Sequence, residues 1–204
     1  MGDRSWADFR LTTFGEPYMV WHDGADFGQL LVEWERDPDL VEAMLLDGLA
    51  QGDPLAAEAI RELPLDEAAA ERLIDALRAA PWGAAMAVEV GQSLARLTGD
   101  EAHTEAVAAV LTSDEHWGDR LDAAMALARF TPTSSLISAL ERGLIDDEYL
   151  VRYHSANSLL AYGGVEQPDI STLDDDFAVV VSGEEAALLA LRDRLGAAAR
   201  ARLE

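Results

Sequence analysis

The side chains best suited to chemistry or recognition cluster in one short segment of the C-terminal half. Three carboxylates precede three aromatic or basic side chains: Asp146, Asp147, Glu148, Tyr149, Arg152 and Tyr153. The spacing of Tyr149, Arg152 and Tyr153 puts them on one face of a helix, and tyrosine and arginine often anchor protein interfaces. We therefore interpret the segment as a candidate partner-binding site with an acidic rim. In the alternative, the acids only cap a helix, one tyrosine packs internally and Arg152 pairs with an upstream acid.

Other candidate sites lack the spacing that their chemistry needs. Residues 22–26, His-Asp-Gly-Ala-Asp, could hold a hard metal ion, but no ligand spacing accompanies them and Asp-Gly marks a turn. His154 stands beside Ser155 without a third partner, and adjacent helix residues point in different directions. The chain has no cysteine, no glycine-rich phosphate-binding loop, no Gly-x-Ser-x-Gly and no His-Glu-x-x-His. We expect no catalytic residues, no metal, no cofactor and no enzymatic activity.

The charge is strongly one-sided. The 204 residues include 39 acidic and 15 basic side chains, all of the latter arginine, for a net charge of −24. Such a surface repels nucleic acid and anionic membranes and favours a basic protein as partner. In the alternative, the acidity reflects a salt-adapted proteome, and the arginine bias a GC-rich genome. No segment approaches the roughly 20 apolar residues of a membrane span, and no signal peptide opens the chain, so we expect a cytoplasmic protein.

The helices that carry these residues recur along the chain. A small residue followed by large residues three and six positions later occurs four times: at 57, 60 and 63, at 91, 94 and 97, at 124, 127 and 130, and at 156, 159 and 162. The copies are 34, 33 and 32 residues apart. A fixed period of this length is typical of solenoids built from helix pairs.

Turn and cap residues divide the repeat region into helices. Pro38 is expected to end one helix and Asp39 to begin the next, Asp53-Pro54 and Asp66 are helix starts, and Gly163-Gly164 is a stop. We group the expected helices 83–98 with 101–112, and 117–130 with 134–144. Residues 1–26 lack a period and form an expected irregular N-terminal cap. Residues 164–204 are expected to form a loop, a short extended segment over 177–181 and a C-terminal capping helix.

Residues 151–163, with Val151-Arg152, Ser155-Ala156, Leu159 and Tyr162-Gly163, resemble the HEAT-repeat pattern Val-Arg-x-x-Ala-Ala-x-x-Leu-x-x-Leu-Gly, and 119–131 resemble it as well. The resemblance implies an all-α fold: a right-handed α-α superhelix, a HEAT-like solenoid of about four to five helix pairs, over residues 27–163. It also implies a concave surface that mainly binds proteins, although the family includes enzymes.

These observations favour a non-catalytic scaffold that binds a basic protein, for example as an inhibitor or immunity-type protein. The alternatives are a HEAT-like enzyme, of the DNA glycosylase or lyase type, and a nucleic-acid mimic whose carboxylates replace phosphates. A glycosylase needs a basic groove, which a cluster of Arg10, Arg36, Arg61 and Arg78 on one face would supply. The sequence leaves the oligomeric state open.

Overall fold

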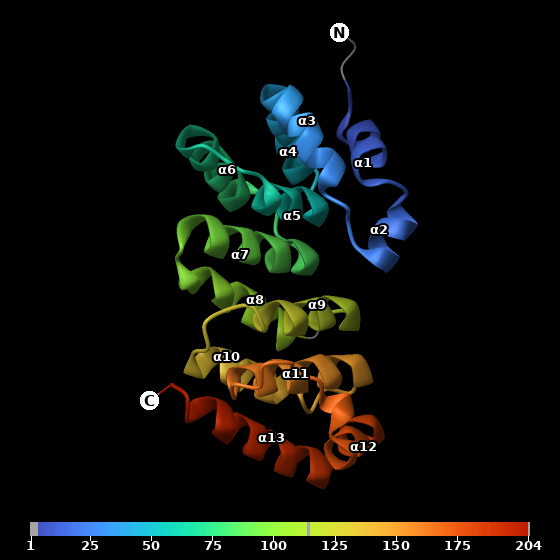
Figure 1. Cartoon of the computed structure of the whole chain (residues 1–204), viewed down its shortest axis with the longest axis vertical. Helices are drawn as coiled ribbons and strands as arrows, with labels where there is room; N and C mark the ends of the chain where they lie inside the picture. Colours follow the sequence, from blue (N-terminus) through green and yellow to red (C-terminus); the bar gives the residue numbers. More distant parts are fainter. Residues whose placement is uncertain (1–3, 114, 204) are drawn as a thin grey trace. The chain divides into compact units, whose positions relative to one another are not determined.

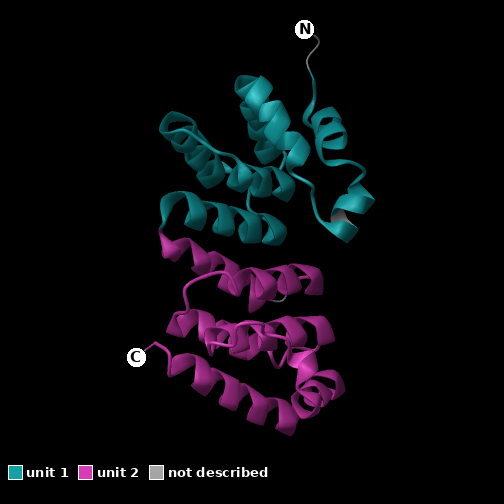
Figure 2. Ribbon diagram, in the orientation of Figure 1, with its two compact units in different colours: residues 1–99 teal, residues 100–204 magenta. Residues whose placement is uncertain are grey.

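The computed structural model describes residues 4–113 and 115–203, apart from the side chain of Trp21. This part of the chain contains thirteen α-helices, two 3-10 helices and no strand (Figure 1), which confirms the expected all-α class. The chain divides into two compact units, Met1–Gly99 and Asp100–Glu204 (Figure 2). The division falls inside the expected repeat region, and the boundaries expected after residues 26 and 163 stay predictions.

The N-terminal unit holds the helices α1 (Trp6–Phe14), α2 (Pro17–Asp23), α3 (Gly28–Arg36), α4 (Pro38–Ala50), α5 (Pro54–Glu62), α6 (Glu67–Ala79) and α7 (Ala84–Thr98). Asp53 and Asp66 cap α5 and α6 through hydrogen bonds from main-chain amides, as predicted. The prediction for Pro38 and Asp39 was wrong. Asp37 is the N-cap of α4 and Pro38 is its first helical residue, because a proline ring fits the first turn, whose N–H groups lack helical partners.

The C-terminal unit holds η1 (Glu101–His103), α8 (Thr104–Leu111), α9 (Trp117–Leu127), α10 (Ser134–Gly143), α11 (Tyr149–Tyr162), η2 (Ile170–Thr172), α12 (Asp174–Ser182) and α13 (Glu185–Arg200). Helix α11 ends at Gly163-Gly164, as predicted, and Gly164 has a φ of 88°. That left-handed conformation favours glycine because it carries no Cβ.

Most helices contact more than one neighbour, so the contacts extend beyond the pairs expected from the sequence. Within the N-terminal unit α4 packs against α5 and α6 against α7, and within the C-terminal unit α8 packs against α9 and α10 against α11. Helix α9 also contacts α10, as the grouping of 117–130 with 134–144 requires, and the grouping of 83–98 with 101–112 spans the two units and stays a prediction. A period fixes how far apart equivalent helices lie, but it does not fix where each pair begins.

Equivalent helices within a unit are joined by a recurring buried hydrogen bond. Ser93 in α7 donates to the carbonyl of Ala57 in α5 at 2.7 Å. Ser158 in α11 donates to the carbonyl of Ala124 in α9 at 2.8 Å. Both serines lie two positions after the small residue of their repeat, and both acceptors are the small residue of an earlier repeat. Small side chains at these positions let the helices approach closely enough for a serine hydroxyl to reach a main-chain carbonyl.

The expected irregular N-terminal cap is instead helical. Ser5 caps α1, whose buried Trp6, Phe9 and Phe14 rings contact one another. Helix α1 packs on α3 and α4, and the indole N–H of Trp6 donates to Asp53 at 2.8 Å. The aromatic residues obscure the helical period in the sequence, but their burial stabilises the helix.

Residues 177–181 are also helical, so the expected extended segment was wrong. They lie in α12, which opens with Asp174, Asp175 and Asp176 in its first turn and ends at Gly183 in the left-handed conformation. The three carboxylates interact favourably with the N-terminal end of the helix dipole. These end signals and the burial of Val180 outweigh the preference of valine for strands.

Candidate functional site

Asp146, the first acid of the candidate site, is held by an arginine of the preceding repeat. Both of its oxygens accept hydrogen bonds from Arg120, from Nε at 2.8 Å and from Nη2 at 2.9 Å. One oxygen also accepts from the main-chain N–H of Glu148 at 2.9 Å, at the start of α11. The hydrogen bonds and charge of Asp146 raise the pKa of the Arg120 guanidinium. This bidentate pair fixes the turn between α10 and α11.

Arg152 is not presented to solvent with the tyrosines, as the sequence interpretation required. Its side chain is buried, at 6% exposure. Nη1 donates to the carbonyls of Asp146 at 2.8 Å and Asp147 at 2.7 Å, and Nε donates to the carbonyl of Val180 at 2.9 Å. The alternative, a pair with an upstream carboxylate, was also wrong, because the acceptors are main-chain carbonyls. That of Val180 belongs to the last turn of α12, where carbonyls lack helical partners and the helix dipole favours a cation.

Tyr149 and Tyr153 do share a face of α11, and their rings contact each other. Tyr153 also contacts the ring of Phe177 in α12, and its hydroxyl donates to Asp169 at 2.8 Å. Hydrogen bonds from Ser171 and Tyr153 hold the pKa of Asp169 below its ordinary value. Both tyrosines are half-buried, and Tyr153 holds the segment between α11 and α12 in place through Asp169. Their contacts are those of packing residues.

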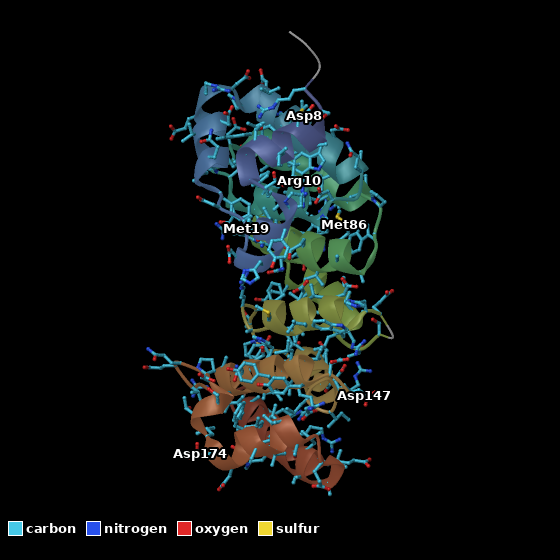
Figure 3. All side chains as sticks on the ribbon, turned by 90° about the vertical axis from the view of Figure 1, so that its right-hand side faces the viewer. Asp8, Arg10, Met19, Met86, Asp147 and Asp174 are labelled. Atoms are coloured by element: carbon cyan, nitrogen blue, oxygen red, sulfur yellow. The ribbon has the colours of Figure 1, made fainter. Side chains whose placement is uncertain are left out.

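Two clefts flank the turn at residues 145–147. One, which we call the acidic cleft, has a volume of about 470 Å³. The acidic cleft is lined by residues 145–147, Arg152, Ser182, Gly183, Glu185, Leu188 and Leu189. The other has a volume of about 340 Å³ and is lined by Ser113, Arg120 and the same turn. Asp147 is exposed at the rim of both clefts, and Figure 3 shows it at the edge of the C-terminal unit.

The acidic cleft contains residues that the sequence did not point to. Ser182, Gly183 and Glu185 stand where α12 gives way to α13, and Leu188 and Leu189 lie on α13. The Ser-Gly-Glu-Glu sequence at 182–185 signals a helix stop followed by a helix start. Nothing in that signal says that this junction packs against the turn before α11, some 36 residues earlier in the chain.

The remaining candidate positions have structural roles. His22 pairs with Asp23 at 2.7 Å on the surface, and Asp26 accepts from the N–H of Gly28 at 2.8 Å. Residues 22–26 therefore form the end of α2 and the start of the connection to α3, where Gly24 has a φ of 83°. Within the described residues, no group of three or more histidine or acidic side chains could hold a metal ion. His154 is half-buried, which lowers its pKa, and its ring stands against Tyr153 rather than Ser155.

Comparison of the chain with protein-family models, curated proteins and solved structures returned no match. No helix in the described part of the chain has the length and apolar character needed to cross a bilayer.

Proposed function

We propose that the chain is a non-catalytic, HEAT-like helical-repeat module, located in the cytoplasm, whose acidic surface binds a basic protein. In its most specific form the partner is an enzyme with a basic cleft, and the module acts as an inhibitor or immunity-type protein. The recurring serine-to-carbonyl bonds, which join helices at the spacing of the repeat, support the HEAT-like architecture. A rigid array of this kind offers a large preformed surface to another protein.

The observation that carries the proposal is the way in which the arginines are used. Nine of the fifteen form ion pairs with carboxylates among the described residues, and Arg152 is occupied by carbonyls. Exposed carboxylates such as Asp147, Asp175 and Glu185 have no ion-pair or hydrogen-bond partner in the same part of the chain. The chain thus pairs most of its cations internally and leaves an excess of carboxylates for a partner.

The same use of arginine weighs against the glycosylase alternative. Arg10 pairs with Asp53, and Arg61 is buried among carboxylates that include Glu89. Arg36 and Arg78 each pair with an acid three residues earlier on the same helix. None of these four arginines is left as an unpaired cation for phosphate contacts, which dominate DNA affinity.

Affinity capture from the cells in which the protein occurs tests this proposal. The immobilised protein is expected to retain a basic protein at low ionic strength and to release it as NaCl approaches about 1 M, where the Debye length is about 3 Å. The control is a variant in which exposed acids are replaced by their amides, and it should retain less. Retention of no protein, or retention that salt does not change, would contradict the proposal.

A further inference from the structure

The acidic cleft combines an aliphatic wall with carboxylates that have no partner. Leu189 of α13 and Ile145 of the turn supply apolar surface, and Ile145 is 40% exposed, whereas Leu188 is buried behind them. Asp147 and Glu185 are exposed, and neither carboxylate has a hydrogen bond or ion pair within the residues that the structure describes. Lysine and arginine side chains match such a surface, because their methylene stems pack on apolar groups while their charged ends reach acids or water.

The charges of the lining favour a cation. Asp146, Asp147 and Glu185 contribute three negative charges and Arg152 contributes one positive charge, so the lining carries −3 + 1 = −2. Asp146 is neutralised by Arg120, which leaves a net charge of −1 even when that neighbouring cation is counted. The carboxylates do not converge as metal ligands, since the described residues contain no group that could hold a metal ion. The complementary ligand is therefore an extended organic cation.

Arg152 adds a hydrogen-bond donor to the wall of the cleft. Its Nε and Nη1 atoms are bound to carbonyls, whereas its Nη2 has no acceptor in the described part of the chain. Nη2 stands beside Gly183 in the cleft wall, where a Cβ built on that glycine would be 3.4 Å away. Solvent reaches Nη2, so water can accept from it when the cleft is empty, and a carbonyl oxygen that replaces this water keeps the hydrogen bond. A peptide supplies both the cation and the acceptor, since a main-chain carbonyl accompanies each of its side chains.

We propose that the acidic cleft binds an arginine or lysine side chain from an extended basic segment of the partner, with a main-chain carbonyl of that segment accepting from Arg152 Nη2. The inference rests on the proposed function and deepens it. The aliphatic stem lies on Leu189 and Ile145, and the cationic end lies between Asp147 and Glu185. The partner is thus recognised by a specific contact as well as by the overall charge of the surface.

A blocked tripeptide, N-acetyl-Gly-Arg-Gly-amide, serves as the probe in an NMR titration of the full-length protein. Saturable shifts are expected for the amides of residues 145–147 and 182–189. The same peptide with citrulline in place of arginine keeps the shape but removes the charge, and it should shift these amides far less. Shifts spread evenly over the acidic surface, or stronger shifts with citrulline, would overturn the proposal.

Substitutions separate the cleft from the general charge. Asp147→Asn with Glu185→Gln should weaken arginine-peptide binding about tenfold, as expected for the loss of two partly exposed ion pairs. Asp174→Asn with Asp175→Asn removes the same charge at exposed positions outside the cleft and should change binding less than twofold. Equal losses in both variants would overturn the proposal. Saturable shifts of the cleft amides with inorganic phosphate would also overturn it, because they would identify an anion site at Arg152.

These results can be told apart from a failure of the proposed function. If the captured basic protein binds the Asp147→Asn, Glu185→Gln variant as tightly as the unchanged chain, the function stands and the cleft is excluded. If the peptide occupies the cleft but no basic protein is captured at any salt concentration, the cleft binds cations and the proposed function is wrong.

Discussion

Replacement of Arg152 by methionine tests whether this buried guanidinium holds the turn before α11 against the end of α12. Methionine keeps much of the side-chain length and apolar volume but has no donor. The change removes three hydrogen bonds of 2.7 to 2.9 Å, to the carbonyls of Asp146, Asp147 and Val180. The unit would then lose its direct link between the turn before α11 and the end of α12.

The three acceptors do not contribute equally. Asp146 and Asp147 lie in a turn that is partly open to solvent, so water can replace the arginine at their carbonyls. Val180 is fully buried, and its carbonyl would be left without a partner. A hydrogen bond from a charged donor contributes about 1.5–3 kcal/mol, and an unsatisfied buried group costs about 1–3 kcal/mol. Methionine also removes the cost of burying a charge, which offsets part of this loss. We therefore expect the free energy of unfolding to fall by about 2–4 kcal/mol.

Urea unfolding gives the total change, and native-state hydrogen exchange locates it. We expect protection to fall first in α12 and at the start of α13, while α8 and α9 keep theirs. Arg194→Met is the matched control, because Arg194 of α13 pairs with Asp176 of α12 in the same unit but is 56% exposed. The control should cost no more than about 1 kcal/mol. If Arg152→Met cost no more than the control, or lowered protection evenly, Arg152 would not be the link between the turn and α12.

Three further predictions concern packing and pH. Ser158→Ala should cost about 1–2 kcal/mol in urea unfolding, because the buried carbonyl of Ala124 loses its side-chain donor; an unchanged midpoint would remove the role given to this bond. Gly48→Ala should destabilise the protein by about 1–3 kcal/mol although alanine favours helices, because the new Cβ would lie 2.7 Å from the Trp6 ring. The tryptophan emission should shift to longer wavelength as the packing of α1 loosens. A stabilised variant would show that α1 can move away at no cost. Burial lowers the pKa of His154, so as the pH falls the unfolded chain is protonated at this histidine before the folded chain is. The free energy of unfolding should therefore fall as the pH drops below about 6.5. His154→Gln should remove that part of the pH dependence, and an equal slope of unfolding free energy against pH for both proteins would contradict the prediction.

The repeat columns predicted which helices lie side by side, because small residues at a fixed period require close packing. Ala57 and Ala124 occupy that column, and the two recurring serine bonds end on their carbonyls. The extent of each contact is harder to predict, for a physical reason. Helix α9, for example, touches α8 and α10, its neighbours along the chain, and also α11, one repeat away, and the residue pattern is similar for all of these contacts.

The chemistry of the candidate site was predicted only in part. The acids at 146–148 do mark the rim of a cleft, but the face with Arg152 turned out to be internal. The periodicity of a helix shows which side chains share a face. It cannot show whether that face meets solvent or a later helix, and here the covering element is α12, read from the sequence as a strand. A strong local preference of valine for extended structure was outweighed by end signals and burial.

The arginine that recurs at equivalent positions of two repeats, Arg120 and Arg152, explains where the unpaired carboxylates lie. Arg120, at its position in one repeat, reaches forward to Asp146 at the start of the next repeat helix. Arg152, at the same position in the following repeat, also contacts a later element, but that element is α12, and Arg152 donates to the carbonyl of Val180. The element that Arg152 meets is α12 and not another repeat helix, and α12 offers a carbonyl in place of a carboxylate. Arg152 Nη2 and the carboxylates of Asp147 and Glu185 are thus left without protein partners among the described residues that line the cleft, which is why we propose a basic peptide segment as its ligand.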